Sequence, residues 1–254
     1  MPFIIFILGL IIGSFLNVVI LRLKSQEQFV TGHSKCPDCL HKLGLWDLIP
    51  LLSFIFLKAK CRYCQNKISW QYILVELSTG ILFVIGYYHY LAGNFTSVIH
   101  LSGYLVYLVF ICFLIIIFVY DLKYYLILDK VSLTAFALAM ILNILLGKTW
   151  QSLFLAALVV GGFFLLQFVI SKGTWIGGGD VRLGLVMGAM LGWPQVLAAL
   201  FLAYILGSII GLGLILFKKK DWKSQLPFGT FLAPATLVVY LWGNSLIKWY
   251  FGIF

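Results

Sequence analysis

Long apolar runs follow one another along almost the whole chain, and this feature most constrains how it can fold. About 20 consecutive apolar residues span the hydrocarbon core of a bilayer. Of 254 residues, 63% are hydrophobic and 10% are charged, whereas soluble domains carry about 25% charged residues. We therefore predict an all-α polytopic membrane protein with about eight transmembrane helices. The predicted spans are roughly residues 2–21, 71–91, 98–120, 126–146, 151–171, 181–192, 195–217 and 229–250.

Two of these runs are unusual. The first, residues 2–21, lacks a basic n-region and a small-residue cleavage site, so we expect a retained helix rather than a signal peptide. The sixth, residues 181–192, is short for a full span. We expect it to be kinked, tilted or continued by its flanks.

Basic residues gather in alternate connections between the predicted spans. These connections hold all 18 Lys and Arg residues except Lys148 and Lys248. Because positive charge marks cytoplasmic loops, we expect these connections in the cytoplasm and both termini outside. Topology and anionic lipid head groups explain the net charge of +10, so we predict no nucleic-acid partner. The basic connections are residues 22–67, 121–130, 172–182 and 218–223.

One hydrophilic stretch, residues 24–70, is long enough to fold outside the membrane. We predict a first transmembrane helix over residues 1–23, a small cytoplasmic domain over 24–70 and a helical bundle over 71–254. Within the small domain, residues 46–57 are apolar but interrupted by Pro50, which favours an interfacial or re-entrant segment.

The hydrophilic stretch carries two C-x2-C pairs, separated by 21 residues, which is close to the zinc-ribbon spacing. Each pair can supply two thiolates to one tetrahedral ion, and four thiolates close the site. Disulfides are the alternative, but a cytosolic domain is reducing. We predict a structural zinc site, and we expect Cys112, inside the third span, to be an inert packing residue. The predicted ligands are Cys36, Cys39, Cys61 and Cys64.

The eight acidic residues can be weighed one by one. Glu76 lies about a turn inside the second span, where an acid is costly and is either functional or a structural hydrogen-bond partner. Four others fall in polar connections, where a solvated surface position suffices for each. These four are Glu27, Asp38, Asp47 and Asp221.

The remaining acids, Asp121, Asp129 and Asp180, lie at the ends of spans that face the basic connections. Each has a structural explanation: an Asp at a helix start caps free amides, which suits Asp129 and Asp180. Asp121 could mark the point where its helix leaves the lipid.

Three glycines, Gly177, Gly178 and Gly179, precede Asp180 and favour a catalytic role for it. Each glycine lowers helix propensity by about 1 kcal/mol, and what it permits is close approach by a neighbouring helix or an extended substrate. In an aspartyl mechanism two carboxyls share a proton, one acting as general base on a water while the other polarises the scissile carbonyl. Asp121 is the first candidate for the partner.

Six motifs in the same order resemble those of the bacterial type IV prepilin peptidases (prepilin leader peptidase/N-methyltransferases). The resemblance runs almost from end to end. The motifs are Gly13 to Ile20 with Arg22, the cysteine pairs around Trp46 to Pro50, Leu74 to Glu76, Asp121 with Asp129, Gly177 to Val181, and Leu226 to Gly229.

The resemblance implies an aspartyl protease of the G-x-G-D class with Asp121 and Asp180 as the dyad, supported by Asp129, Glu76 and the glycines 177–179. It implies a bacterial inner-membrane enzyme that cuts the short basic leader of a prepilin or pseudopilin after a glycine, on the cytoplasmic side. Such enzymes serve type IV pili, type II secretion or competence, and often methylate the new N-terminus with S-adenosylmethionine.

Two positions depart from the family pattern. Leu128 stands where Pro is common before the Asp matched by Asp129, and Thr230 replaces a frequent Pro after Phe228-Gly229. We expect neither change to touch a reacting group.

Two other functions remain open from the residues alone. A small-solute transporter could use the three aspartates in an ion pathway, although transporter sites lie near the bilayer midplane rather than at one rim. A non-catalytic assembly factor could hold pilin-like helices through the bundle.

Overall fold

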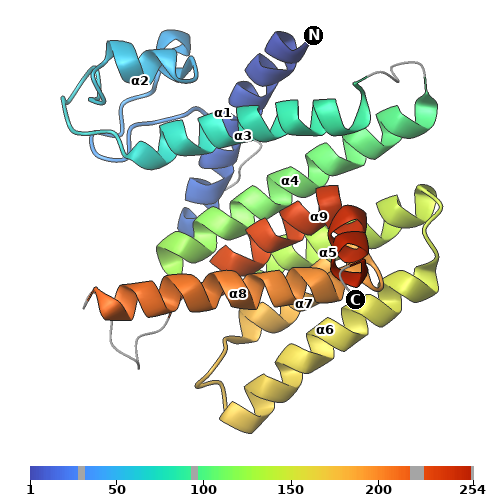
Figure 1. Cartoon of the computed structure of the whole chain (residues 1–254). Helices are drawn as coiled ribbons and strands as arrows, with labels where there is room; N and C mark the ends of the chain where they lie inside the picture. Colours follow the sequence, from blue (N-terminus) through green and yellow to red (C-terminus); the bar gives the residue numbers. More distant parts are fainter. Residues whose placement is uncertain (28–31, 93–96, 218–225, 253–254) are drawn as a thin grey trace. The chain divides into compact units, whose positions relative to one another are not determined.

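The computed structural model describes residues 1–27, 32–92, 97–217 and 226–252, and most of them lie in helices (Figure 1). The predicted all-α fold is confirmed. The predicted basic connection 218–223 lies outside the described residues, as does Asp221. The helices are α1 (Pro2–Ser25), the 3-10 helix η1 (Leu45–Leu48), α2 (Leu52–Phe56), α3 (Trp70–Tyr90), α4 (Val98–Tyr124), α5 (Asp129–Leu145), α6 (Trp150–Ser171), α7 (Gly178–Leu191), α8 (Gln195–Leu216) and α9 (Gly229–Phe251).

Each of the eight predicted spans corresponds to one helix. Within the described ranges, six helices are long and apolar enough to cross a membrane, namely α1, α3, α4, α6, α8 and α9. The other two are shorter: α5 has 17 residues and α7 has 14. At 1.5 Å per residue α7 is about 21 Å long, less than the thickness of a bilayer core. A count of eight full crossings stays a prediction.

The chain divides into two compact units, residues 1–104 and 105–254. In the first unit α1 packs against α3. The two backbones come so close that a Cβ added to Gly13 would lie 2.7 Å from the Cα atom of Glu76. Small residues permit such contact between membrane helices. The fully buried Asn17 links the same pair, because its Nδ2 donates to the carbonyl oxygen of Tyr72 at 3.1 Å.

The hydrophilic segment of this unit folds as two similar knuckles. Each is closed by an isolated antiparallel bridge, Lys35 with Lys42 in one and Lys60 with Lys67 in the other. Inside each knuckle the first cysteine donates its amide to a carbonyl five residues on, His41 or Asn66. The two C-x2-C pairs therefore have the same local backbone arrangement.

Asp47, between the knuckles, corrects one expectation from the sequence. Its side chain is only 5% exposed and is not simply solvated. Its carboxylate accepts hydrogen bonds from Arg62 Nε at 2.7 Å, from the hydroxyl of Tyr63 at 3.2 Å and from the amide of Gly44 at 3.1 Å. Arg62 and Tyr63 lie 15 and 16 residues further along the chain, so Asp47 is covered only when the segment is folded.

In the second unit, the short helix α7 is surrounded by α5, α6, α8 and α9. Leu183, Val186 and Met187 are among its fully buried side chains. Its last carbonyls are capped from another segment: Asn143 Nδ2 donates to Ala189 at 2.7 Å, and Lys148 Nζ donates to Met190 at 3.2 Å. These bonds give partners to carbonyl groups that the end of α7 would otherwise leave without one.

Candidate active site and metal centre

The four predicted metal ligands lie together. The sulfur atoms of Cys36, Cys39, Cys61 and Cys64 are all within 4.8 Å of one another, and none is in a disulfide. The Sγ atoms of Cys36 and Cys64 are 3.9 Å apart. A tetrahedral zinc ion with Zn–S bonds of about 2.3 Å needs sulfur–sulfur edges of about 3.8 Å. The cluster can therefore hold a metal ion of this size.

Backbone amides favour the thiolate of Cys61, whereas burial and the neighbouring thiols raise the pKa values of Cys36 and Cys64. Amides of Cys64 and Tyr63 donate to the Cys61 sulfur and lower the pKa of Cys61 to about 7. The pKa of Cys36 is raised, chiefly because burial disfavours its charged form. Four neighbouring thiolates repel one another, so full ionisation needs a cation between them.

Asp121 lies in the last turn of α4 and is 5% exposed. Its Oδ2 accepts a hydrogen bond from the backbone amide of Thr230 at 3.0 Å. Residue 229 must be small, because a Cβ added to Gly229 would lie 2.8 Å from the same oxygen. The first turn of α9 thus holds the carboxyl of Asp121 in place with its backbone.

Asp180 lies in the first turn of α7 and is 7% exposed. Its Oδ2 accepts a hydrogen bond from the backbone amide of Gly177 at 3.1 Å, so it does cap its own helix. It also lies close enough to Asp121 for the charge of that residue to act on it. The fold therefore brings the two predicted dyad residues together.

The loop between α4 and α5 fills the space beside the two aspartates. Ile127 in this loop packs against two glycines: a Cβ on Gly179 would lie 2.9 Å from Ile127 Cβ, and a Cβ on Gly229 would lie 3.1 Å from its Cδ1. Of the three consecutive glycines, Gly179 is the one at which an added Cβ would collide with a neighbouring side chain. The nearest atoms to a Cβ on Gly177 or on Gly178 are 3.8 Å away.

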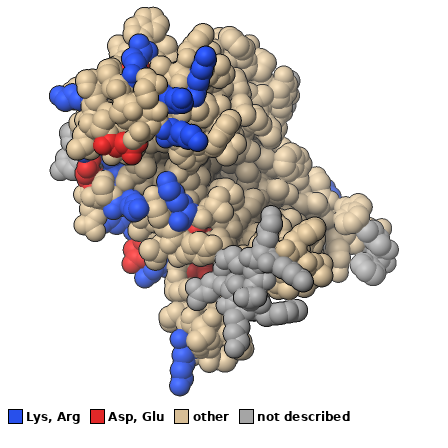
Figure 2. Space-filling view, turned by 90° about the vertical axis from the view of Figure 1, so that its left-hand side faces the viewer, with Lys and Arg blue, Asp and Glu red and all other residues tan. Residues whose placement is uncertain are grey.

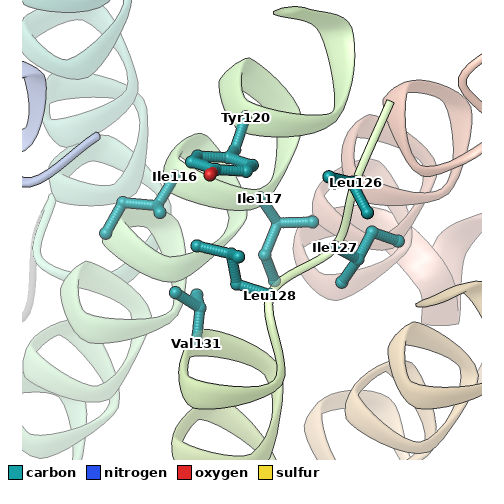
Figure 3. Close-up of a pocket in the computed structure, with 7 residues that line it drawn as sticks. All are labelled: Ile116, Ile117, Tyr120, Leu126, Ile127, Leu128 and Val131. Atoms are coloured by element: carbon teal, nitrogen blue, oxygen red, sulfur yellow. The ribbon is translucent and has the colours of Figure 1, made fainter. Parts of the chain in front are cut away.

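A small apolar pocket lies under the same loop (Figure 3). Its side chains come from α4, from the loop and from the first turn of α5. Apart from the Tyr120 hydroxyl these groups are hydrocarbon, so the pocket packs the loop and offers little for polar chemistry. The lining residues are Ile116, Ile117, Tyr120, Leu126, Ile127, Leu128 and Val131.

The two supporting acids have other partners. Asp129, the first residue of α5, makes an ion pair with Arg182 of α7 at 2.6 Å, and both side chains are exposed. Glu76 lies in the first unit, where its Oε2 accepts the amide of Leu51 at 2.9 Å. Its structural role is therefore a tether between α3 and the turn that precedes α2.

Sequence reasoning missed several residues beside the aspartates. Thr230 was expected not to touch a reacting group, yet its amide contacts Asp121. Proline has no amide hydrogen and could not donate to Asp121. The replacement of a frequent proline by Thr230 was therefore the one indication of this contact in the sequence. Leu128 differs: its φ of −76° is one that proline also adopts, so that departure leaves the backbone unchanged.

An aromatic and polar group on α6 and α8 also borders the site. The ring of Tyr204 lies 5.0 Å from that of Phe228, next to Gly229. Its hydroxyl accepts from Gln167 Nε2 at 3.2 Å and is near enough to Asp180 to be influenced by its charge. Gln167 and Tyr204 are polar residues in two otherwise apolar helices, and this pattern in the sequence could have indicated that they border a functional site.

These features define a class: a helical membrane protein with two buried aspartates at helix ends and a separate four-cysteine site. Residues 7–90 match the bacterial peptidase A24 N-terminal domain, and residues 108–212 match the type IV leader peptidase family. The chain belongs to this peptidase family.

Curated relatives agree over nearly the full length. A prepilin leader peptidase/N-methyltransferase of Bacillus subtilis is 33% identical over 97% of this chain and 96% of its own length. One from Aeromonas salmonicida is 32% identical over 97% of this chain and 92% of its own length. No solved structure matches the chain. These comparisons do not support the transporter alternative.

Proposed function

We propose that this protein is an aspartyl endopeptidase that removes the short basic leader from type IV prepilin-like precursors after a glycine. The observation that carries the proposal is the pairing of Asp121 and Asp180. The two are buried and come from different helices, and Asp180 lies within range of the charge of Asp121. Ile127 packs against both Gly179, which precedes Asp180, and Gly229, which adjoins the Asp121 carboxyl. The family membership and the names of the relatives give the reaction class.

The chemistry follows from how the two carboxyls are held. In each, a backbone amide binds Oδ2 and fixes the orientation of the carboxyl. The ionised carboxyl takes a proton from a water molecule, and the water oxygen attacks the scissile carbonyl carbon. The protonated carboxyl donates to the carbonyl oxygen. The carboxyl that took the water proton then gives it to the leaving nitrogen, and the other carboxylate takes back a hydroxyl proton as the carbon–nitrogen bond breaks. The carboxyl of the leader and the new amino terminus separate.

The glycines beside Asp180 give the substrate room. A Cβ on Gly177 or on Gly178 would meet its nearest neighbour only at 3.8 Å, so the backbone of an extended peptide has room to approach the carboxyl from this side. Cleavage next to the hydrophobic helix of a precursor requires this part of the protein at a membrane surface. The basic connections support a position of that surface on the cytoplasmic side of the inner membrane, with both termini outside.

The four cysteines are proposed to hold a structural zinc ion. Zinc bound by four thiolates has no open position for a substrate or water, and it stabilises the fold of its domain. In this protein the four sulfurs come from two knuckles, so the ion would join them. The aspartates would carry out the cleavage without it.

N-methylation of the new terminus is the second proposed activity, because the relatives carry methyltransferase in their names. The pocket near the start of α1 is lined by Pro2, Phe3, Phe6 and side chains of α3. This apolar lining does not suit the charged groups of S-adenosylmethionine, so we assign no residue to a methyl donor and derive no transfer step.

The test of this function is mass spectrometry of a prepilin incubated with the purified protein, with and without S-adenosylmethionine. We expect cleavage after a glycine in both samples, and a mass increase of one methyl group only with the donor. An intact precursor after incubation with well-folded protein, together with retained binding, would favour the assembly factor instead.

A further inference from the structure

An exposed apolar face lies on η1 and α2, within the hydrophilic segment of the first unit. Leu45 and Trp46 on η1 are 86% and 77% exposed, and Ile55 and Phe56 on α2 are 61% and 78% exposed. Large apolar side chains exposed together on two neighbouring short helices mark a surface that binds a partner or a membrane. We refer to residues 45–57 as the apolar segment.

The apolar segment is fixed beside α3 at two points. Phe54 is buried, and its ring lies 5.2 Å from that of Trp70, the first residue of α3. The amide of Leu51 donates to Glu76. Glu76 is six residues further along α3 than Trp70, which is about 9 Å along the helix axis.

This tether sets the depth of the segment. Because α3 is long and apolar enough to span a membrane, a backbone group bound at Glu76 lies below the start of the apolar helix. Rings exposed on this segment, such as those of Trp46 and Phe56, would then meet the head-group and upper acyl region. Amphipathic elements bind membranes at this depth.

The charged residues in and beside the apolar segment also suit a lipid surface. Asp47, its one ionisable residue, is turned inward and bound by Arg62, Tyr63 and Gly44. Exposed basic residues follow directly, at Lys58 and Lys60. Lys and Arg side chains are plentiful on the face drawn in Figure 2, where few acids accompany them. Basic residues next to an apolar surface favour anionic lipid.

We propose that the apolar segment is an interfacial element that inserts into an anionic lipid surface and holds the cysteine domain against the membrane. A precursor helix or residues 105–254 could cover the same face, but the Glu76 tether and the flanking lysines favour lipid. The proposal does not depend on the identity of the catalytic residues.

Site-specific photocrosslinking tests the contact directly. The full chain would carry p-benzoylphenylalanine at position 46 or 56, in vesicles of phosphatidylethanolamine with phosphatidylglycerol. Matched controls carry it at position 65 or 66, where Gln65 and Asn66 are exposed polar residues of the same domain. Zinc content serves as the folding check for each variant. We expect lipid adducts by mass spectrometry at 46 and 56, at least fivefold above the controls.

Other products would overturn the proposal. Adducts to residues 105–254, adducts to an added precursor in place of lipid, or lipid yields equal to those at 65 and 66 would each exclude a lipid-bound face. For the charge arm, we expect the double variant Lys58→Gln with Lys60→Gln to lose about fivefold or more of the adduct to phosphatidylglycerol, since each basic residue contributes about 1 kcal/mol near such a surface. Lys248→Gln is the control, and an unchanged yield in the double variant would exclude the anionic preference.

A second variant tests the depth. Glu76→Leu removes the acceptor for the Leu51 amide, whereas Glu76→Gln keeps a carbonyl oxygen in place. If the tether sets the depth, Glu76→Leu lowers the lipid adduct at position 56 severalfold at unchanged zinc content, and Glu76→Gln retains most of it. Equal yields in wild type and Glu76→Leu would show that the segment does not rely on α3 for its position.

Discussion

The cysteine site and the aspartate site are assembled in different ways. The cysteines sit in two local knuckles, each closed within a few residues by a bridge and by amide hydrogen bonds. The aspartates come from the end of α4 and the start of α7, and the start of α9 completes their surroundings. A local motif can form the first site, whereas the second exists only when several helices are packed.

The two sites also differ in what they leave free. Four sulfurs within 4.8 Å of one another make a closed set for a tetrahedral ion. Each aspartate is held at Oδ2 by a backbone amide and belongs to no such closed set of ligands. We therefore propose that the first site serves stability and the second serves cleavage, and this separation can be tested.

Loss of either dyad carboxyl is expected to have the largest effect. In Asp121→Asn or Asp180→Asn the amide cannot act as general acid or base, so leader cleavage should fall by about 10³-fold. The double variant should be little worse than either single one, since the pair acts as a unit. The measurement is the single-turnover rate of precursor cleavage at equal amounts of membrane-inserted protein.

Asp129→Asn is the matched control for the dyad. Asp129 is bound to Arg182 at the surface, so its change should lower the rate less than tenfold. A loss as large as that of Asp121→Asn would make Asp129 the partner of Asp180.

Gly229→Ala should have the next largest effect on cleavage. The added Cβ would lie 2.8 Å from Asp121 Oδ2 and must displace that carboxyl. A shift of about 1 Å can cost about 10²-fold in rate, so we expect a loss of roughly 10- to 100-fold with normal insertion. In Gly213→Ala no atom lies within 4 Å of the new Cβ, and the rate should stay at the wild-type value. Equal rates for the two variants would mean that α9 does not position Asp121.

Cys61→Ser should affect the fold of the knuckles more than the chemistry. Losing one of four thiolates weakens metal binding, and the segment 32–69 should become sensitive to protease. We expect lost zinc in elemental analysis and less than a tenfold drop in cleavage rate. Cys112→Ala, outside the cluster, should keep both. A zinc-free protein with an intact, protease-resistant domain would contradict a structural role for the metal.

The sequence predicted the helices well because apolar runs of about 20 residues have few alternatives to a membrane helix. It also predicted the cysteine cluster, since the C-x2-C spacing nearly determines the turn. The short helix α7 was less predictable, because its end depends on caps from Asn143 and Lys148, which are distant in sequence.

Long-range hydrogen bonds account for what the sequence could not reveal. Thr230 is 109 residues from Asp121, and Leu51 is 25 residues from Glu76. Both contacts involve backbone amides, which every residue except proline possesses, so residue type gives no signal for them. Asp47 was misjudged for a related reason: its burial results from Arg62 and Tyr63 folding over it.

Thr230 offers the finest test of how the aspartate site is held. Thr230→Pro removes the amide that binds Asp121, and proline is tolerated in the first turn of a helix such as α9. Thr230→Ala removes the side chain but keeps that amide. Hydrogen bonds to charged groups contribute about 1.5–3 kcal/mol, but a carboxyl at a membrane surface can recover part of this from water. We therefore expect a loss of cleavage rate of about three- to tenfold for Thr230→Pro and almost none for Thr230→Ala, measured as single-turnover rates on one precursor. If alanine were the more damaging change, the Thr230 hydroxyl, which donates to Pro227 at 2.6 Å, would be the important group, and the amide contact to Asp121 would be secondary.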